Sequence, residues 1–303
     1  MISRDLYAAI ESTSFNMEFL CAHALNNIKS ANKMDDAELL LFSTLPAFTV
    51  GYITPIYLNA LFPFTAPGQI KRHLEHLIEL KLLLPASEDH YFLTEKGEHL
   101  AAWMSKEVNN ALTGVMPSSA TTMMDMTSQL KEIADACYKA LEPPRKLHLA
   151  VQRKLTPAGT IPIMVRIQQI LKELAAYRID AHQSAWSAYI FDAHAWEILT
   201  LLWQGKKLNV DAMHQTLACR GFTLEETFSS ISELSRRGWV VNGNDDLAIT
   251  PFGAEIRRIA ENTTDRYYFA PWQSFSDASL TVLRELVEEF RRGIPMIELK
   301  VDD

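Results

Sequence analysis

The strongest constraint on the fold is a local sequence that occurs twice. Residues 92–103 read FLTEKGEHLAAW, and residues 248–259 read AITPFGAEIRRI. Each segment places an apolar residue, a threonine and, three residues later, a glycine before an apolar run at helical spacing. Self-similarity at a separation of 156 positions indicates an internal duplication of one structural unit.

The similarity continues upstream of both glycines. Each copy has an amphipathic helix, a charged turn, a short apolar run, a polar tip and a second apolar run that ends at the threonine. The runs 82–84 and 239–241 correspond at a spacing of 157, and the tips PASEDH and NGNDD are rich in turn-forming residues. Thr94 and Thr250 are predicted to cap the helices that follow. Both copies therefore predict helix, β-hairpin, helix.

Two further helices are predicted in front of each such unit. In the second copy, residues 194–203 are apolar at helical spacing and Asn209 caps a second helix. Thr223 opens the third helix, with Glu226 three residues later completing a capping box. Two helices, a turn, a third helix and a hairpin make a winged helix-turn-helix.

The first copy has segments in the same positions. AELLLFSTLPAF and YITPIYLNALF correspond to its first two helices. Thr65 is the predicted cap of the third helix, and Pro67 falls in the first turn, where proline is permitted. The first copy therefore predicts a second winged helix.

Long flanking helices and a linker complete the predicted organisation. Helices are predicted over residues 4–30 and 162–190, and Pro143-Pro144 ends the helix TTMMDMTSQLKEIADACYKAL. The predicted fold class is mainly α with small β-hairpin wings. The predicted divisions are winged-helix domain 1 with flanking helices at residues 1–142, a linker at 143–161, and winged-helix domain 2 with flanking helices at 162–303.

Composition limits the class of protein further. The chain is 48% hydrophobic and 22% charged, as globular proteins are, and its 11 glycines form no Gly-rich loop of a nucleotide-binding α/β fold. No uncharged apolar run of about 18 residues occurs, and the N-terminus lacks a signal-peptide core, so we expect no membrane partner. Three scattered cysteines suit a reducing cytoplasm, which is the predicted location, and none has zinc-site spacing.

Three motifs relate the chain to a known family. They are the LT-x-x-G turn after the wing, the helix end LIELKLLL, and the terminal helix SDASLTVLRELVEEF. With these motifs the chain resembles the MarR-type winged-helix transcriptional regulators. Members of that family have one winged helix per chain and pair two chains through their terminal helices. The resemblance therefore implies two winged-helix domains in an intrachain pseudo-dimer, acting as a monomer or as a homodimer.

The predicted DNA contacts lie at the start of the third helix of the first copy, the part that enters the major groove in such domains. Gln69 and Arg72 can pair with base edges, Lys71 can anchor a phosphate, and His73 lies beside them. An ordinary solvated helix face explains the same residues equally well. Arg145 and Lys146, in the predicted linker, are further candidates for phosphate contact, although they also suit a solvated linker.

The second copy is less suited to DNA. Its third helix begins with Glu225 and Glu226 where phosphates would lie, and carboxylates there also stabilise a helix N-terminus without any ligand. Both wing tips are acidic, with Glu88-Asp89 in one and Asp245-Asp246 in the other. The net charge of −8 likewise lacks the basic footprint of a nucleic-acid binder, although a local basic patch would be enough.

MarR-type regulators often bind small aromatic or amphipathic effectors, and the resemblance implies a ligand pocket lined by Trp186, Tyr189 and Trp196. Packing in a large helical core explains most of these aromatic residues as well. The later aromatic group at Tyr267, Tyr268, Phe269 and Trp272 lies in a matching region.

No catalytic motif occurs, so we expect no enzyme, no cofactor and no metal site. The repeated D-A-H at residues 180–182 and 192–194 is better explained by helix capping than by a metal or proton-relay site. Cys219, in the turn before a third helix, is a candidate redox switch, although a lone thiol with no visible activator is more often inert.

Two functions therefore remain open. One is a DNA-binding transcriptional regulator of MarR-like type, with double-stranded DNA as partner and the first copy as the main reader. The other is a winged-helix module that has lost DNA binding and recognises a protein or a small ligand. Gln69, Lys71 and Arg72 favour the first, whereas the acidic charge and the wing tips favour the second.

Overall fold

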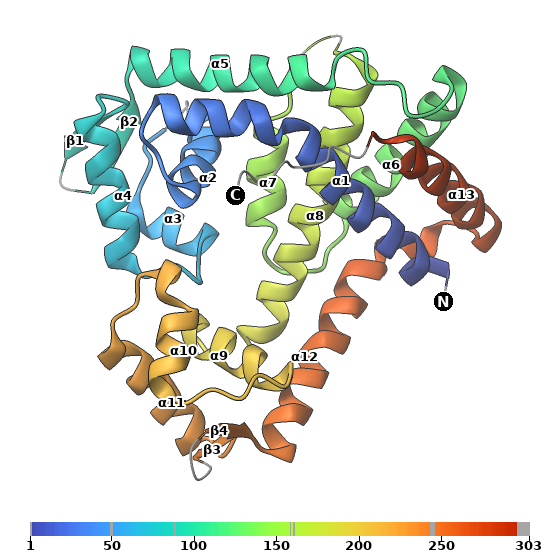
Figure 1. The fold of residues 1–303 in the computed structure, drawn as a ribbon. Helices are drawn as coiled ribbons and strands as arrows, with labels where there is room; N and C mark the ends of the chain where they lie inside the picture. Colours follow the sequence, from blue (N-terminus) through green and yellow to red (C-terminus); the bar gives the residue numbers. More distant parts are fainter. Residues whose placement is uncertain are drawn as a thin grey trace, which may run out of the picture. The chain divides into compact units, whose positions relative to one another are not determined.

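The computed structural model describes residues 2–48, 51–87, 89–157, 159, 161–242 and 246–295. Within these residues the chain is mainly helical and has two separate antiparallel hairpins (Figure 1). This confirms the prediction of a mainly α fold with small β wings. None of the described helices combines the length and the apolar character that crossing a membrane requires.

The chain forms two compact units that are discontinuous in sequence. The helical unit comprises residues 1–49, 95–180 and 267–303, and the wing unit comprises residues 50–94 and 181–266. This division differs from the predicted consecutive domains, because the long flanking helices of both sequence halves pack with one another. It also brings the hairpins of both copies into the same unit.

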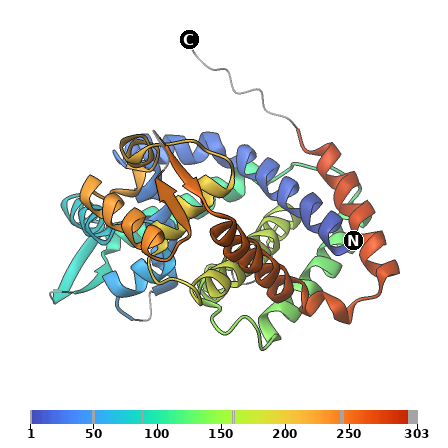
Figure 2. The same cartoon turned by 90° about the horizontal axis from the view of Figure 1, so that it is seen from below.

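The helical unit is built from long amphipathic helices. Helix α1 packs along α5 and α13, and α13 also packs along α6; α1 and α13 lie side by side in both views (Figures 1 and 2). One face of α13 is buried through Leu280, Leu283, Val287 and Phe290, at the spacing of an amphipathic helix. The elements of this unit are α1 (Ile2–Ala31), α2 (Asp36–Thr44), η1 (Leu45–Phe48), α5 (Glu95–Leu112), α6 (Ala120–Lys139), α7 (Leu147–Lys154), η3 (Pro271–Ser274) and α13 (Asp277–Gly293).

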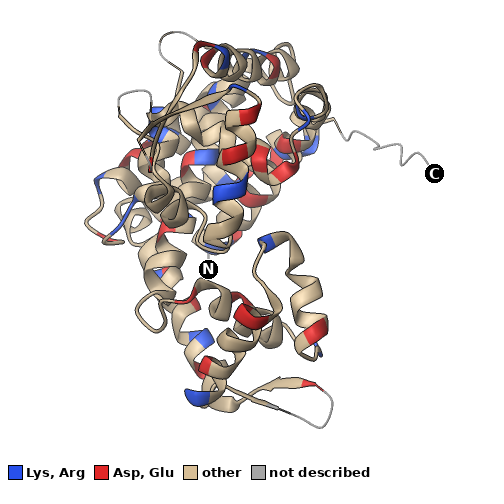
Figure 3. Ribbon diagram, turned by 90° about the vertical axis from the view of Figure 1, so that its left-hand side faces the viewer, with Lys and Arg blue, Asp and Glu red and all other residues tan. Residues whose placement is uncertain are grey.

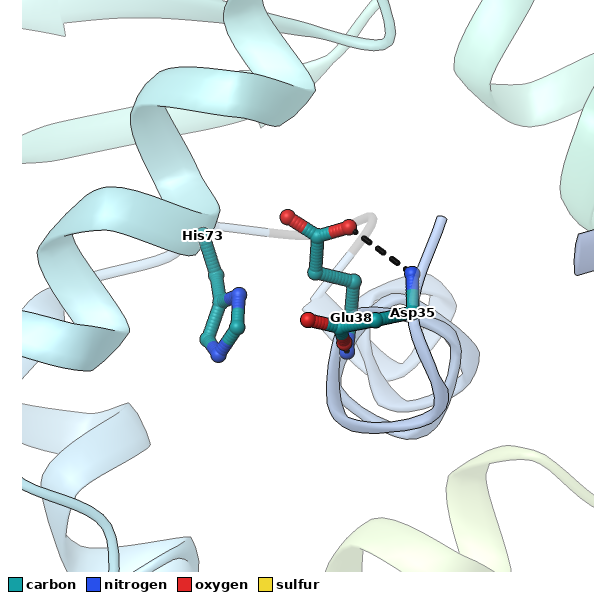
Figure 4. Close-up of side chains that lie close together, drawn as sticks. All are labelled: Asp35, Glu38 and His73. Carbon is teal, nitrogen blue, oxygen red and sulfur yellow. Dashed lines mark hydrogen bonds between the residues drawn. The ribbon is translucent and has the colours of Figure 1, made fainter. Parts of the chain in front are cut away.

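Helix α7 lies within the segment that was predicted to be a linker. Its first turn is held by the buried Asp180, whose carboxylate accepts the backbone N–H groups of His148 and Leu149, both at 2.9 Å. This cap comes from a residue 32 positions away, so no local signal revealed it. The start of α2 is capped locally instead: the Asp35 N–H bonds the Glu38 carboxylate at 3.1 Å, and the Glu38 N–H bonds Asp35 at 2.7 Å (Figure 4).

The wing unit contains the helix-turn-helix elements and both hairpins. From the first copy come α3 (Pro55–Leu61), α4 (Pro67–Glu79), β1 (Leu83–Ser87) and β2 (His90–Leu93). From the second come α9 (Ala193–Trp203), α10 (Val210–Thr216), η2 (Ala218–Arg220), α11 (Leu224–Arg236), β3 (Val240–Asn242) and β4 (Leu247–Ile249). Helices α8 (Ile163–Trp186) and α12 (Pro251–Phe269) contribute residues to both units.

Corresponding turns of the two copies make the same hydrogen bonds. After α4, the Thr94 hydroxyl donates to the Lys81 carbonyl at 2.7 Å; after α11, the Thr250 hydroxyl donates to the Gly238 carbonyl at 2.7 Å. Lys81 and Gly238 both have positive φ, at 60° and 71°. Each hairpin also bonds a residue just before the second helix of its copy, Ile53 with Tyr91 and Leu208 with Leu247.

The presence of glycine at position 253, in the motif of the second copy, has a steric explanation. A Cβ at Gly253 would lie 2.3 Å from the carbonyl oxygen of Trp239, the residue immediately before β3. The N–H of Gly253 also donates to the Thr250 hydroxyl at 3.0 Å, which confirms Thr250 as the cap of α12. Only glycine allows this helix to begin so close to the hairpin backbone.

The predicted caps are correct where the partner is local. Asn209 caps α10, and Thr223 with Glu226 forms the capping box of α11. The prediction that Thr65 caps this helix of the first copy was wrong: α4 begins after Ala66, whose side chain makes no capping hydrogen bond. The Ala66 N–H instead donates to the Arg220 carbonyl of the second copy at 2.8 Å.

Candidate nucleic-acid interface

Helix α4 has a buried face and an exposed basic face. Ile70, Leu74 and Leu77 are buried in the wing unit, at a spacing of three and four residues. Lys71 and Arg72 lie on the exposed face. Lys71 reaches Glu75 only at 4.0 Å, a contact that costs little to exchange for a phosphate.

The other two predicted DNA contacts, Gln69 and His73, interact with each other along α4. His73 is only 3% exposed and lies on the buried face of α4, so its imidazole cannot face a base edge. Gln69 is half-buried; its amide nitrogen lies 2.9 Å from the His73 ring nitrogen, and its oxygen accepts from the Arg72 guanidinium, with Nε at 3.1 Å. The spacing already placed His73 with Ile70 and Leu77, so helical periodicity could have identified it as buried.

The corresponding face of α11 is not basic. At the spacing of 157 residues, Phe228 and Ser229 occupy the positions of Lys71 and Arg72. Phe228 is 60% exposed, and Leu224, one turn earlier, is 45% exposed. Glu226 closes the capping box, which confirms a structural role for one of the two predicted carboxylates. Over the described ribbon as a whole, residues of both charge signs are interspersed (Figure 3).

The C-terminal arginines of α11 are held by a single carboxylate. Glu233 accepts from Arg236 at 2.9 Å and from Arg237 at 2.6 Å, and these hydrogen bonds, first that of Arg236, lower the pKa of Glu233. Arg237 also donates to the Tyr189 carbonyl at 3.0 Å. The two arginines therefore stabilise the end of α11. Of the wing tips, Asp89 and Asp246 belong to the described residues, whereas Glu88 and Asp245 lie outside them.

The two basic residues of the predicted linker, Arg145 and Lys146, have different surroundings in the helical unit. Arg145 is exposed. The Lys146 ammonium donates to the carbonyls of Cys137, Tyr138 and Ala140 at the end of α6, at 3.3 Å and 2.6 Å for the first two. Burial lowers the pKa of Lys146. This lysine neutralises the carbonyl end of a helix, a common position for a cation.

The two helix-turn-helix turns meet inside the wing unit. Besides the bond from the Ala66 N–H to the Arg220 carbonyl, the Arg220 guanidinium lies 6.0 Å from the centre of the Phe64 ring. Gly221 has φ of +78°, and a Cβ there would lie 2.6 Å from the Cβ of Gln69. The first turn of α4 is therefore in direct contact with the turn before α11.

The aromatic residues predicted to form a ligand pocket are packed in the core of the wing unit. Trp186 and Trp196 are 3% and 1% exposed and stack at 6.1 Å with 17° between their planes, while Tyr189 is half-buried. The Arg257 guanidinium lies 4.9 Å and 5.0 Å from the ring centres of Trp196 and Trp203. Whether Trp186, Tyr189 and Trp196 take up a ligand stays a prediction.

A groove in the helical unit has an aromatic wall. It lies between the start of α1, η3 and the start of α13 and has a volume of about 660 Å³. Phe269, Trp272 and Phe275 line it, together with the charged residues Arg4 and Asp5. The volume is within the range of small-molecule sites.

The geometry of the wing unit agrees with the comparison to known families. A family model described as a helix-turn-helix family matches residues 58–296. The chain belongs to this helix-turn-helix family. The match starts within α3 and extends past the end of α13, so it includes the third helix of both copies. Membership indicates a DNA-binding regulator at a coarse level. No curated protein and no solved structure matches the chain.

Within this helix-turn-helix chain, the D-A-H motifs serve helix capping, as the sequence favoured. Asp192 accepts the backbone N–H groups of His194 and Ala195 at the start of α9, and its other oxygen accepts from Ser230 at 2.6 Å. His194 is buried, bonds Thr227 at 3.1 Å and stacks on Phe222 at 4.0 Å. Burial lowers the pKa of His194.

A buried charged network in the wing unit was missed at the level of sequence. Arg257 is 5% exposed; it pairs with Glu261 one turn later and donates to the Thr200 hydroxyl at 3.1 Å. The carboxylate of Glu261 also lies 3.7 Å from His182. The spacing of four between Arg257 and Glu261 was a readable signal, whereas the partners on α8 and α9 depend on tertiary packing.

Proposed function

We propose that this chain is a DNA-binding transcriptional regulator of MarR-like type whose two winged helices form a pseudo-dimer within one polypeptide. The repeated hydrogen bonds of Thr94 and Thr250, and the matched positive-φ residues that accept them, support a tandem duplication. The common wing unit supports an association of the two copies inside one chain.

We further propose that the first copy alone reads DNA. The observation that carries this proposal is the difference between corresponding faces: Lys71 and Arg72 on α4 against Phe228 and Ser229 on α11. Two cations can neutralise two phosphates, which gives a modest affinity with a salt slope of about −1.8 in log–log form. In the second copy, the apolar ring of Phe228 at the position of Lys71 contributes nothing to phosphate binding.

The test is capture of genomic DNA fragments by the purified protein over a range of salt concentrations. We expect retention at low salt that declines as salt rises, with a log–log slope of about −1.8, and that is strongly weakened by the double variant Lys71→Ala/Arg72→Ala. The matched control is Lys139→Ala/Arg258→Ala, which removes two exposed cations from α6 and α12. Equal weakening by both double variants would reduce the effect to net charge and overturn α4 as the reader.

The exposed apolar residues of α11 favour a second candidate function. Leu224 and Phe228 on a recognition-type helix suit contact with a protein rather than with DNA. If the wild-type protein retains no fragment even at low salt, this interaction function replaces DNA binding.

We also propose that a small aromatic or amphipathic molecule modulates the protein, and the groove beside Trp272 is the place to test it. Aromatic acids should raise the melting temperature of the wild-type protein and not of Phe275→Ala, which removes part of the groove wall. An equal rise in both would remove the groove from the proposal.

A further inference from the structure

The contact between the two helix-turn-helix turns involves corresponding segments of the two copies. Residues 63–66 precede α4, and residues 220–223 precede α11, at the same spacing of 157. A contact between corresponding surfaces is what a twofold-related pair makes at its axis. We call this contact, residues 63–66 with Gln69 against residues 220–223, the turn clasp.

Three interactions hold the turn clasp together. The Ala66 N–H, at a helix start without a side-chain cap, donates to the Arg220 carbonyl at 2.8 Å. The Arg220 side chain is fixed by Glu197, with Nη2 at 2.6 Å and Nε at 3.0 Å from one oxygen, and lies over the Phe64 ring. Gly221 leaves no space for a Cβ against Gln69.

The turn clasp brings the starts of α4 and α11 close together. Arg220 precedes the α11 cap Thr223 by three residues, which span at most about 11 Å of extended chain. Adding the 2.8 Å bond and the covalent links from its two atoms to their Cα atoms places the Cα atoms of the two helix caps no more than about 18 Å apart. Helices that read successive major grooves are separated by about 34 Å. In this arrangement the two copies cannot grip a palindrome together.

The turn clasp also restricts the insertion of α4 into a major groove, even when α4 is the only helix that binds DNA. A major groove about 12 Å wide admits one helix, whose diameter with side chains is about 10–12 Å. The turn at residues 220–223 is bonded to the first residue before α4, so it would have to enter the groove together with the helix. Gln69, the predicted base-reading amide, is packed against Gly221. Full insertion of the start of α4 requires the clasp to separate.

We propose that the turn clasp is an autoinhibitory contact that keeps the start of α4 out of the major groove. This inference rests on the proposed function, because it concerns the same DNA-reading helix. Separation of residues 63–66 from 220–223 frees the first turn of α4, and a ligand or partner that favours separation activates DNA binding.

The test variant is Ala66→Pro. Ala66 has φ of −57°, a value that proline adopts, so the substitution removes the N–H that bonds Arg220. Ala66 is only 2% exposed, so the proline ring also adds two carbons at a packed position, and a variant that leaves Ala66 in place is needed beside it. The control is Ala120→Pro, at the first residue of α6, where proline is tolerated and the N–H has no helical partner. Arg220→Gln, which leaves α4 unchanged and removes the pair with Glu197, is the second variant should Ala66→Pro misfold.

Two measurements on the full chain test separately whether the turn clasp opens and whether its opening strengthens DNA binding. Hydrogen exchange of peptides covering residues 62–74 and 217–223 reports whether the clasp opens, and fluorescence anisotropy reports affinity for a fragment retained by the wild-type protein. We expect faster exchange in both peptides and about fivefold tighter DNA binding, as loss of one net hydrogen bond implies, with no change for Ala120→Pro.

Unchanged exchange in both clasp variants would show that the contact is not held in solution and overturn the inference. Faster exchange with unchanged or weaker binding would show a contact without an inhibitory role, and this also overturns it. Absence of binding by the wild-type protein and both variants refutes the proposed function, and with it the inhibitory role, while the exchange data still report the contact.

Discussion

Replacement of Gly253 by alanine tests why the duplicated motif contains a glycine. In a free helix the substitution would be favourable by about 1 kcal/mol, because alanine is the better helix former. Here the added Cβ would lie 2.3 Å from the carbonyl oxygen of Trp239 and 2.9 Å from its carbonyl carbon. These are backbone atoms that cannot rotate away, so α12 or the wing must shift.

The expected result is a net loss of about 2 kcal/mol in the free energy of unfolding. Overpacking costs about 1–3 kcal/mol and here falls at the upper end, and a shift also lengthens the 2.9 Å bond from the Thr250 N–H to the Trp239 carbonyl. The assay is urea unfolding followed by circular dichroism, with the slope m checked for constancy.

Gly68→Ala is the matched control. Gly68 lies in the first turn of α4, and a Cβ there would meet no atom within 4 Å. We expect this variant to be stabilised by about 0.4–1 kcal/mol. If Gly253→Ala is as stable as the wild-type protein, or if both variants change stability in the same direction, the steric explanation of the motif glycine is refuted.

The remaining predictions concern titration and charge. Because burial lowers the pKa of His194, the unfolded chain takes up this proton more readily, so the stability His194 contributes is present above its ordinary pKa of 6.5 and is lost as pH falls below it. His194→Gln should flatten the loss of stability between pH 7 and pH 5; an unchanged slope contradicts the assignment. Lys146→Met should lower the free energy of unfolding by about 1–3 kcal/mol, since three carbonyls lose their donor, and should leave DNA binding unchanged. If Lys146→Met is fully folded but binds DNA more weakly, the prediction that Lys146 contacts a phosphate would be supported instead.

Local signals predicted the parts of the fold that local chemistry determines. Asn209, Thr223 and Glu226 cap helices through partners three residues away, so reading the sequence was sufficient. Both hairpins followed from the alternation of apolar runs and turn residues. The start of α4 was misplaced by one residue, because its N–H partner is the Arg220 carbonyl on a distant turn.

The candidate site was only partly predictable for the same reason. The exposure of Lys71 and Arg72 follows from the helical spacing of α4, and that spacing also places His73 on the buried face. Lys146 looked like a free cation in a linker, but its three carbonyl partners exist only once α6 and α7 are packed. The turn clasp combines residues separated by 154 positions, a contact that no periodicity encodes.

The most direct measurement is a hydroxyl-radical footprint of the protein on a DNA fragment that it retains. One reading helix should protect a single asymmetric patch of backbone around one major groove, and Lys71→Ala/Arg72→Ala should erase it. Two equivalent patches separated by about 10 base pairs, related by a palindromic sequence, would contradict the account, because both copies would then be reading DNA.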